Sequence, residues 1–249
     1  MFDHVTIRVS NLKASTRFYD LVFERIDFDG APYVGGGFHE WNDFSISRSG
    51  DQQSLTRRLH IAFVAPSRRH VDEFWSVLTG AGYRDDGPPG LRPDYHDDYY
   101  GAFVLDPDGN SVEAVHHGRA RGGENVIDHL WIRVADLGAS KRFYETVAPM
   151  LGLHIAGERR ERFHVAGAGR SFALVTGEPP TENVHLAFPV EDNAGVEEFH
   201  RVALAAGYRD NGPPGERTIY HAGYFGAYVL DPDGNNVEAV NHNRTRQDI

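Results

Sequence analysis

The stretch Asp3–Val9, which reads DHVTIRV, returns as DHLWIRV at Asp128–Val134, 125 residues later. The same offset relates Val104–Asn110 to Val229–Asn235, and both read VLDPDGN. A repeat that covers nearly the whole chain indicates two tandem copies of one domain. The expected organisation is a first domain over 1–118, a linker over 119–125 and a second domain over 126–249.

Composition limits the classes of protein that fit. At 249 residues the chain is long enough for two cores of about 120 residues each. A net charge of −11 argues against nucleic-acid binding, which needs clustered Lys and Arg. No apolar run is long enough to span a membrane, and the first ten residues lack a signal-peptide pattern. We therefore expect a cytoplasmic protein with a small-molecule substrate, either a monomer or a homodimer.

Each half shows the same order of elements. Strand, helix and further strands follow one another twice per half, which predicts four modules in an α+β fold. In the first half, the segments expected to form strands or helices are Val5–Val9, the helix from Asn11 to about Val22, Phe44–Ser47, His60–Ala65, Ser67–Gly80, Gly101–Leu105 and Ser111–Val115.

Strand alternation places three polar residues toward a shared concavity. His4 lies on the face opposite Val5 and Ile7, and His60 and Glu113 also lie on consistent faces of their strands. The second half repeats the three as His129, His185 and Glu238. Two imidazoles and one carboxylate suit a mononuclear metal with open coordination positions. With no cysteine in the chain, thiolate ligands are excluded.

These residues resemble those of the vicinal oxygen chelate superfamily, which includes glyoxalase I, bleomycin resistance proteins and extradiol dioxygenases. The resemblance is carried by Asp3–Val9, by His60 at the start of its strand, and by Tyr95–Glu113, with equivalents such as Tyr220–Val240 in the second half. It implies paired βαβββ modules that form two half-open barrels, each around a divalent metal. The ligands implied are His4, His60, Glu113, His129, His185 and Glu238.

The resemblance also narrows the chemistry. Glyoxalase I-like members have a further glutamate ligand on the fourth strand, but Phe44–Ser47 and Phe172–Val175 contain no carboxylate. The favoured function is an Fe(II) extradiol-type dioxygenase that acts on a small, oxygen-rich, aromatic substrate, although Mn(II) and Zn(II) suit the same ligands. The alternatives are a binding protein that sequesters a drug or metabolite, and a non-redox metal-dependent lyase, epimerase or thiol transferase.

Several other residues are candidates for the site. His96 and His221 precede the glutamate ligands by 17 residues and are expected to act as acid or base. Tyr95, Tyr99, Tyr220 and Tyr224 are candidates for hydrogen bonding to the substrate, and otherwise belong to the core. Further candidates for substrate binding are Arg8, Arg133 and Trp131.

Two ways of combining the modules remain open. Pairing within each half unites His4 with His60 and Glu113, whereas exchanged pairing unites His4 with His185 and Glu238. We favour pairing within each half, because the linker is short and every module is present in order. We also expect the second cavity to be the better catalytic candidate. It would combine Trp131, a flat surface for an aromatic ring, with the neutral Ala222–Gly223 beside His221.

Overall fold

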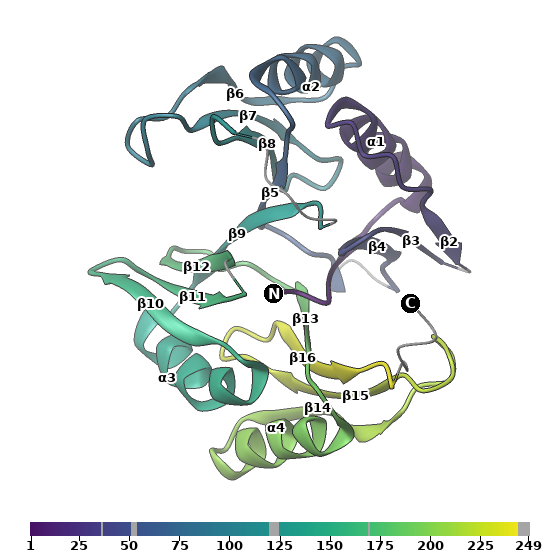
Figure 1. The fold of residues 1–249 in the computed structure, drawn as a ribbon, viewed down its shortest axis with the longest axis vertical. Helices are drawn as coiled ribbons and strands as arrows, with labels where there is room; N and C mark the ends of the chain where they lie inside the picture. The colour runs from purple at the N-terminus through teal and green to yellow at the C-terminus, as the bar shows by residue number, and fades with distance from the viewer. Residues whose placement is uncertain (36, 51–53, 120–124, 169, 244–249) are drawn as a thin grey trace. The chain divides into compact units, whose positions relative to one another are not determined.

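The computed structural model describes residues 1–35, 37–50, 54–119, 125–168 and 170–243 (Figure 1). Most of the expected linker, residues 120–124, lies outside the described residues. Each of the four modules is a strand, a helix and three more strands. The first comprises β1 (His4–Val9), α1 (Leu12–Arg25), β2 (Tyr33–Gly35), β3 (Phe38–Trp41) and β4 (Phe44–Arg48). The second comprises β5 (His60–Val64), α2 (Arg68–Gly80), β6 (Asp85–Leu91), β7 (Tyr100–Leu105) and β8 (Ser111–His116).

The second half repeats this order. The third module comprises β9 (Ile127–Val134), α3 (Leu137–Val147), the short 3-10 helix η2 (Ala148–Leu151), β10 (His154–Arg159), β11 (Arg162–Gly167) and β12 (Arg170–Thr176). The fourth comprises β13 (His185–Pro189), α4 (Asn193–Ala205), β14 (Arg209–Glu216), β15 (Phe225–Leu230) and β16 (Asn236–Asn241). The expected α+β fold of four βαβββ modules is confirmed.

Local sequence explains where the helices start and which face they bury. Asn11 caps α1 by accepting a hydrogen bond from the Ala14 amide at 3.1 Å, and Asp136 caps α3 through the Ala139 amide at 2.9 Å. In β1, Val5, Ile7 and Val9 are fully buried, whereas His4 is only partly buried. The apolar face of the strand therefore faces the core, and the polar face is left for the site.

No helix among the described residues is long and apolar enough to cross a membrane.

The strands form two open sheets of eight. Their orders are β14-β15-β16-β13-β1-β4-β3-β2 and β10-β11-β12-β9-β5-β8-β7-β6. Within every module the first strand lies beside the last. The first strand of each half also lies beside a strand of the other half, because β1 neighbours β13 and β9 neighbours β5.

The compact units of the protein differ from the two sequence repeats at their edges. One unit contains residues 6–131, and the other contains residues 1–5 together with 132–249. His129 thus belongs to the unit built mostly from the first repeat, and His4 belongs to the unit built mostly from the second. Each unit contains one histidine that comes from the other repeat.

Candidate metal centres

In the 6–131 unit, three strands bring His60, Glu113 and His129 together. Ala62 on β5 is paired with Glu113 of β8 on one side and with His129 of β9 on the other. His60 lies two residues before Ala62 and therefore points to the same face. The His60 Nε2 atom is 3.1 Å from Oε2 of Glu113, and the His129 Nε2 atom is 3.7 Å from that oxygen. We call this cluster the His129 site.

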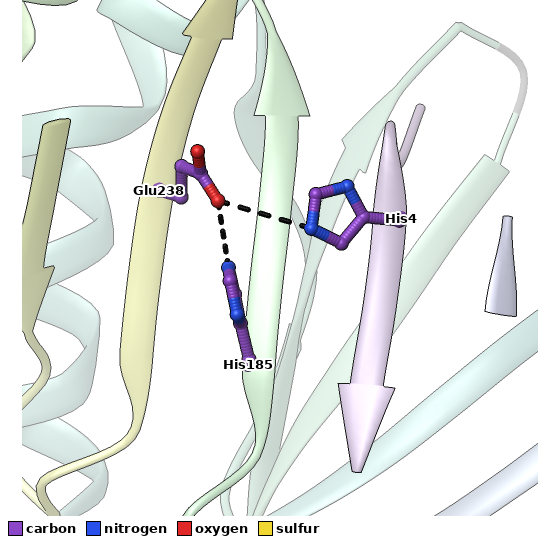
Figure 2. Close-up of side chains that lie close together, drawn as sticks. All are labelled: His4, His185 and Glu238. Carbon is purple, nitrogen blue, oxygen red and sulfur yellow. Dashed lines mark hydrogen bonds and ion pairs between the residues drawn. The ribbon is translucent and has the colours of Figure 1, made fainter. Parts of the chain in front are cut away.

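The other unit contains the equivalent cluster of His4, His185 and Glu238, shown in Figure 2. Oε2 of Glu238 is 2.8 Å from Nε2 of His185 and 3.8 Å from Nε2 of His4. Ala187 pairs with Glu238 across β13 and β16, and its carbonyl accepts a hydrogen bond from the Asp3 amide at 2.9 Å. We call this cluster the His4 site. In both sites the candidate ligand atoms lie within 4.8 Å of one another.

The expectation that each half gathers its own three ligands is wrong. His4 lies with His185 and Glu238, so the first ligand of each half joins the other two ligands of the opposite half. The physical reason is the sheet order, in which β1 neighbours β13 and β9 neighbours β5. Strand alternation fixed which face each ligand occupies, but it carried no information about which strand would become the neighbour.

Buried charge makes these clusters suitable for a cation. The carboxylates of Glu113 and Glu238 are 1% and 0% exposed, whereas the four histidine side chains are 17–20% exposed. Burial raises the pKa of Glu238, but the hydrogen bond and charge of His185 outweigh it and lower the pKa overall. A buried carboxylate is costly without a compensating charge, and the partly exposed imidazoles leave an approach from solvent.

A tyrosine holds the far oxygen of each glutamate. The Tyr99 hydroxyl donates to Oε1 of Glu113 at 2.8 Å, and the Tyr224 hydroxyl donates to Oε1 of Glu238 at 2.7 Å. Burial and the neighbouring glutamate charge raise the pKa of both tyrosines well above the usual range, so both remain protonated donors. Because Oε1 is occupied in this way, Oε2 faces the two imidazoles. Both tyrosines thus contact the carboxylate that sequence analysis assigned as a ligand.

Glycine makes room for each carboxylate. A Cβ added at Gly101 would lie 2.3 Å from Oε1 of Glu113, and one at Gly226 would lie 2.6 Å from Oε1 of Glu238. A side chain at either of these two positions would therefore displace the glutamate.

Aspartates orient the first histidine of each site. Asp3 Oδ1 lies 2.8 Å from Nδ1 of His4, and Asp128 Oδ2 lies 2.7 Å from Nδ1 of His129. Burial raises the pKa of both carboxyls, but hydrogen bonds from two histidines each outweigh it and hold the pKa well below the usual range. An ionised aspartate fixes the proton on Nδ1, so the Nε2 atom presents its lone pair toward the cluster. This role was not predicted from the sequence, although both aspartates directly precede the histidines.

The two sites have different aromatic neighbours. Trp131 lies near His60 with ring centroids 6.1 Å apart, and Tyr95 lies edge-on to Trp131 at 5.8 Å. On the strand beside each glutamate, Phe103 is opposite Glu113, whereas Tyr228 is opposite Glu238. Burial and the charge of Glu238 raise the pKa of the Tyr228 phenol. The second cavity was expected to contain both Trp131 and the loop after His221. In the structure these two features lie in different sites. Tyr228 was not predicted from the sequence, because nothing in the sequence distinguishes it from a core aromatic.

His96 and His221 lie outside the two triads. Nε2 of His96 is 2.7 Å from Nδ1 of His117, and Nε2 of His221 is 2.8 Å from Nδ1 of His242. Each ring also contacts the tyrosine that holds the glutamate, with centroids 5.4 Å apart.

The two arginines also lie outside the triads. Arg133 is exposed and Arg8 is partly buried. Among the described residues, neither guanidinium makes an ion pair or hydrogen bond with a triad residue, and their amides donate to Thr56 and Thr181.

The chain is built from two tandem repeats and contains two candidate metal sites. Comparison with known proteins identifies its family. The model of the Glyoxalase/Bleomycin resistance protein/Dioxygenase superfamily matches residues 1–114 and 126–239. The chain belongs to this superfamily, as the sequence motifs predicted. Together with the two donor sets, this membership indicates a metal-dependent enzyme.

Solved structures share the fold over almost the full length. Glyoxalase I from Zea mays is 18% identical with a TM-score of 0.69, and the match covers 97% of this chain and 92% of that one. A Bacillus subtilis protein assigned provisionally as a dioxygenase is 14% identical with a TM-score of 0.63, covering 98% of this chain and 85% of that one. A search of curated proteins found no significant match.

Proposed function

We propose that the protein is a metal-dependent dioxygenase of extradiol type that acts on a small, oxygen-rich aromatic compound. The proposal rests on the two His–His–Glu triads, in each of which two Nε2 atoms and one carboxylate oxygen converge. This ligand set leaves open positions on an octahedral cation and is typical of non-haem Fe(II) oxygenases. Fe(II) is therefore favoured over Mn(II) and Zn(II).

A bound divalent cation would supply Lewis acidity toward a chelating substrate and, as Fe(II), redox chemistry with O2. The protein's own groups would hold and orient it. His4, His185 and Glu238 are the proposed ligands at one site, and His60, Glu113 and His129 at the other. Tyr99 and Tyr224 would keep one glutamate oxygen turned toward the metal, since each occupies the other oxygen.

The donor count supports dioxygenase chemistry over glyoxalase I chemistry. In the described part of the chain each candidate cluster contains three residues, without a further carboxylate. Three protein ligands leave room for two substrate oxygens and O2 on a six-coordinate metal.

The His129 site is the proposed location of the aromatic substrate. Trp131 and Tyr95 offer ring faces beside His60, and aromatic pairs of this kind contribute about 0.5–1.5 kcal/mol beyond burial. His96 would exchange protons with solvent near this site, as His221 would near the other. Arg8 and Arg133 remain available for an anionic substituent of the substrate.

Oxygen uptake tests the proposal. Protein reconstituted anaerobically with Fe(II) should consume O2 when catechol or a substituted catechol is added, and Glu113→Gln should abolish the uptake. His60→Ala should abolish it and His185→Ala should not, if the substrate binds at the His129 site. Tight catechol binding without O2 uptake would favour sequestration. Zn(II)-dependent conversion without O2 would favour a non-redox lyase, epimerase or thiol transferase.

A further inference from the structure

A chain of four side chains leads outward from each site. From the His4 site it runs through His4, Asp3, His242 and His221. Asp3 Oδ2 is 2.8 Å from Nε2 of His242, and Nδ1 of His242 is 2.8 Å from Nε2 of His221. From the His129 site it runs through His129, Asp128, His117 and His96, with contacts of 2.7, 3.0 and 2.7 Å. In both chains the two outer imidazoles are stacked.

The outer ends of the chains differ in hydrogen-bond polarity. Nδ1 of His221 is 2.8 Å from the carbonyl oxygen of Ala222, which can only accept, so this nitrogen must carry a proton. Nδ1 of His96 instead accepts from the Asp98 amide at 3.3 Å, so it carries none.

Counting protons then separates the two chains. Each hydrogen bond within a chain contains one proton. The three hydrogen bonds that join the first histidine to the last therefore contain three protons. The His4 chain needs a fourth for the contact of His221 with Ala222, and the His129 chain does not. The difference of one proton holds wherever the protons sit within each chain. With the aspartates ionised, the His221–His242 pair is a cation and the His96–His117 pair is neutral.

We propose that the His221–His242 pair holds one proton more than the His96–His117 pair and thereby makes His4 a weaker metal ligand than His129. This inference rests on the proposed metal sites. Because Asp3 faces a cationic imidazole pair, its carboxylate is a weaker hydrogen-bond acceptor for the Nδ1 proton of His4. The Nε2 atom of His4, the proposed ligand atom, is therefore less basic. The positive charge also opposes a bound cation.

The groups around each pair are consistent with this assignment. Asp3, the Tyr224 ring and Glu216, which accepts from the Gly223 amide at 3.1 Å, surround the His221–His242 pair. Asp128, Tyr99 and Asp98 surround the His96–His117 pair, and Asp98 is itself 3.7 Å from Arg68. The ionised Asp3 carboxylate, 2.8 Å from Nε2 of His242, stabilises the additional proton of the first pair.

Nitrogen NMR of the metal-free protein tests the proton count directly. With histidine labelled by nitrogen-15, His221 and His242 should together carry three ring protons at pH 7, and His96 and His117 should carry two. His242→Asn and His117→Asn assign the signals. Two protons on both pairs, or three on both, would overturn the proposal.

Mn(II) binding, measured by calorimetry at pH 6.5, tests the consequence. Glu113→Gln removes the His129 site, so that the His4 site can be measured alone, and Glu238→Gln does the reverse. Adding His221→Gln to Glu113→Gln should raise Mn(II) affinity by roughly tenfold, the usual size of effects from residues that hydrogen-bond to a metal ligand. The matched His96→Gln in Glu238→Gln should leave the affinity unchanged. Equal effects of the two changes would overturn the proposal. Absence of Mn(II) binding in both parents would contradict the proposed function instead, and the NMR count would still decide the protonation.

Discussion

The hydroxyl of Tyr224 donates to Oε1 of Glu238 at 2.7 Å, and a second phenol, that of Tyr228, lies opposite Glu238 on the neighbouring strand. The equivalent Glu113 accepts from Tyr99, but the residue opposite it on β7 is Phe103, which has no hydroxyl. Glu113 and Glu238 occupy equivalent positions in the repeat, but their carboxylates have different numbers of phenol groups beside them.

Removing the tyrosine hydroxyls should affect the two sites unequally. Tyr99→Phe should weaken metal binding at the His129 site by about tenfold, because Glu113 becomes free to rotate. Tyr224→Phe should have a smaller effect at the His4 site, since the Tyr228 phenol opposite Glu238 is placed to donate in its stead. Calorimetric Mn(II) titration, with the other site removed by Glu→Gln, measures both. A larger loss for Tyr224→Phe would contradict this account.

Double substitutions should reveal which ligands share a metal. Wild-type protein is expected to bind two metal ions per chain. His4→Ala with His185→Ala should leave one ion bound, because both changes affect the same site. His4→Ala with His60→Ala should leave none. Pairing within each half would give the opposite pattern, and metal analysis after dialysis distinguishes the two.

Two equivalent tyrosines should differ in their contribution to stability. The Tyr19 hydroxyl donates to the buried Asp106 at 3.0 Å, whereas the buried Tyr144 hydroxyl has no partner among the described residues. Tyr19→Phe should lower the free energy of unfolding by about 1–2 kcal/mol, and Tyr144→Phe should leave it unchanged or raise it. Urea denaturation midpoints measure both variants. Equal losses would show that Tyr144 has a partner in solution.

Asp231 should make the protein less stable as the pH rises through the mildly acidic range. Burial, only partly offset by hydrogen bonds from Asn235, raises the pKa of Asp231 to about 6. The folded state therefore binds a proton that the unfolded state has released, and this stabilisation is lost between about pH 4 and pH 6. The loss is at most about 3 kcal/mol. Asp231→Asn should flatten the slope of unfolding free energy against pH over this range, and an unchanged slope would show that Asp231 does not contribute.

The amino-acid sequence by itself determined the repeat, the βαβββ modules and the identity of the candidate ligands. These are local properties, because strand alternation places Val5 inward and His4 on the opposite face whatever strand lies beside them. The offset of 125 residues then selected the triads from 14 histidines.

Only the tertiary structure decided which ligands meet. DHVTIRV and DHLWIRV share the same alternation of apolar and polar residues, so this pattern does not distinguish β5 from β13 as the neighbouring strand. The network from Asp3 to His221 was hidden for the same reason, because His242 and Asp3 lie 239 residues apart and are joined by one hydrogen bond. Such contacts follow from strand order, which local hydrophobic pattern does not encode.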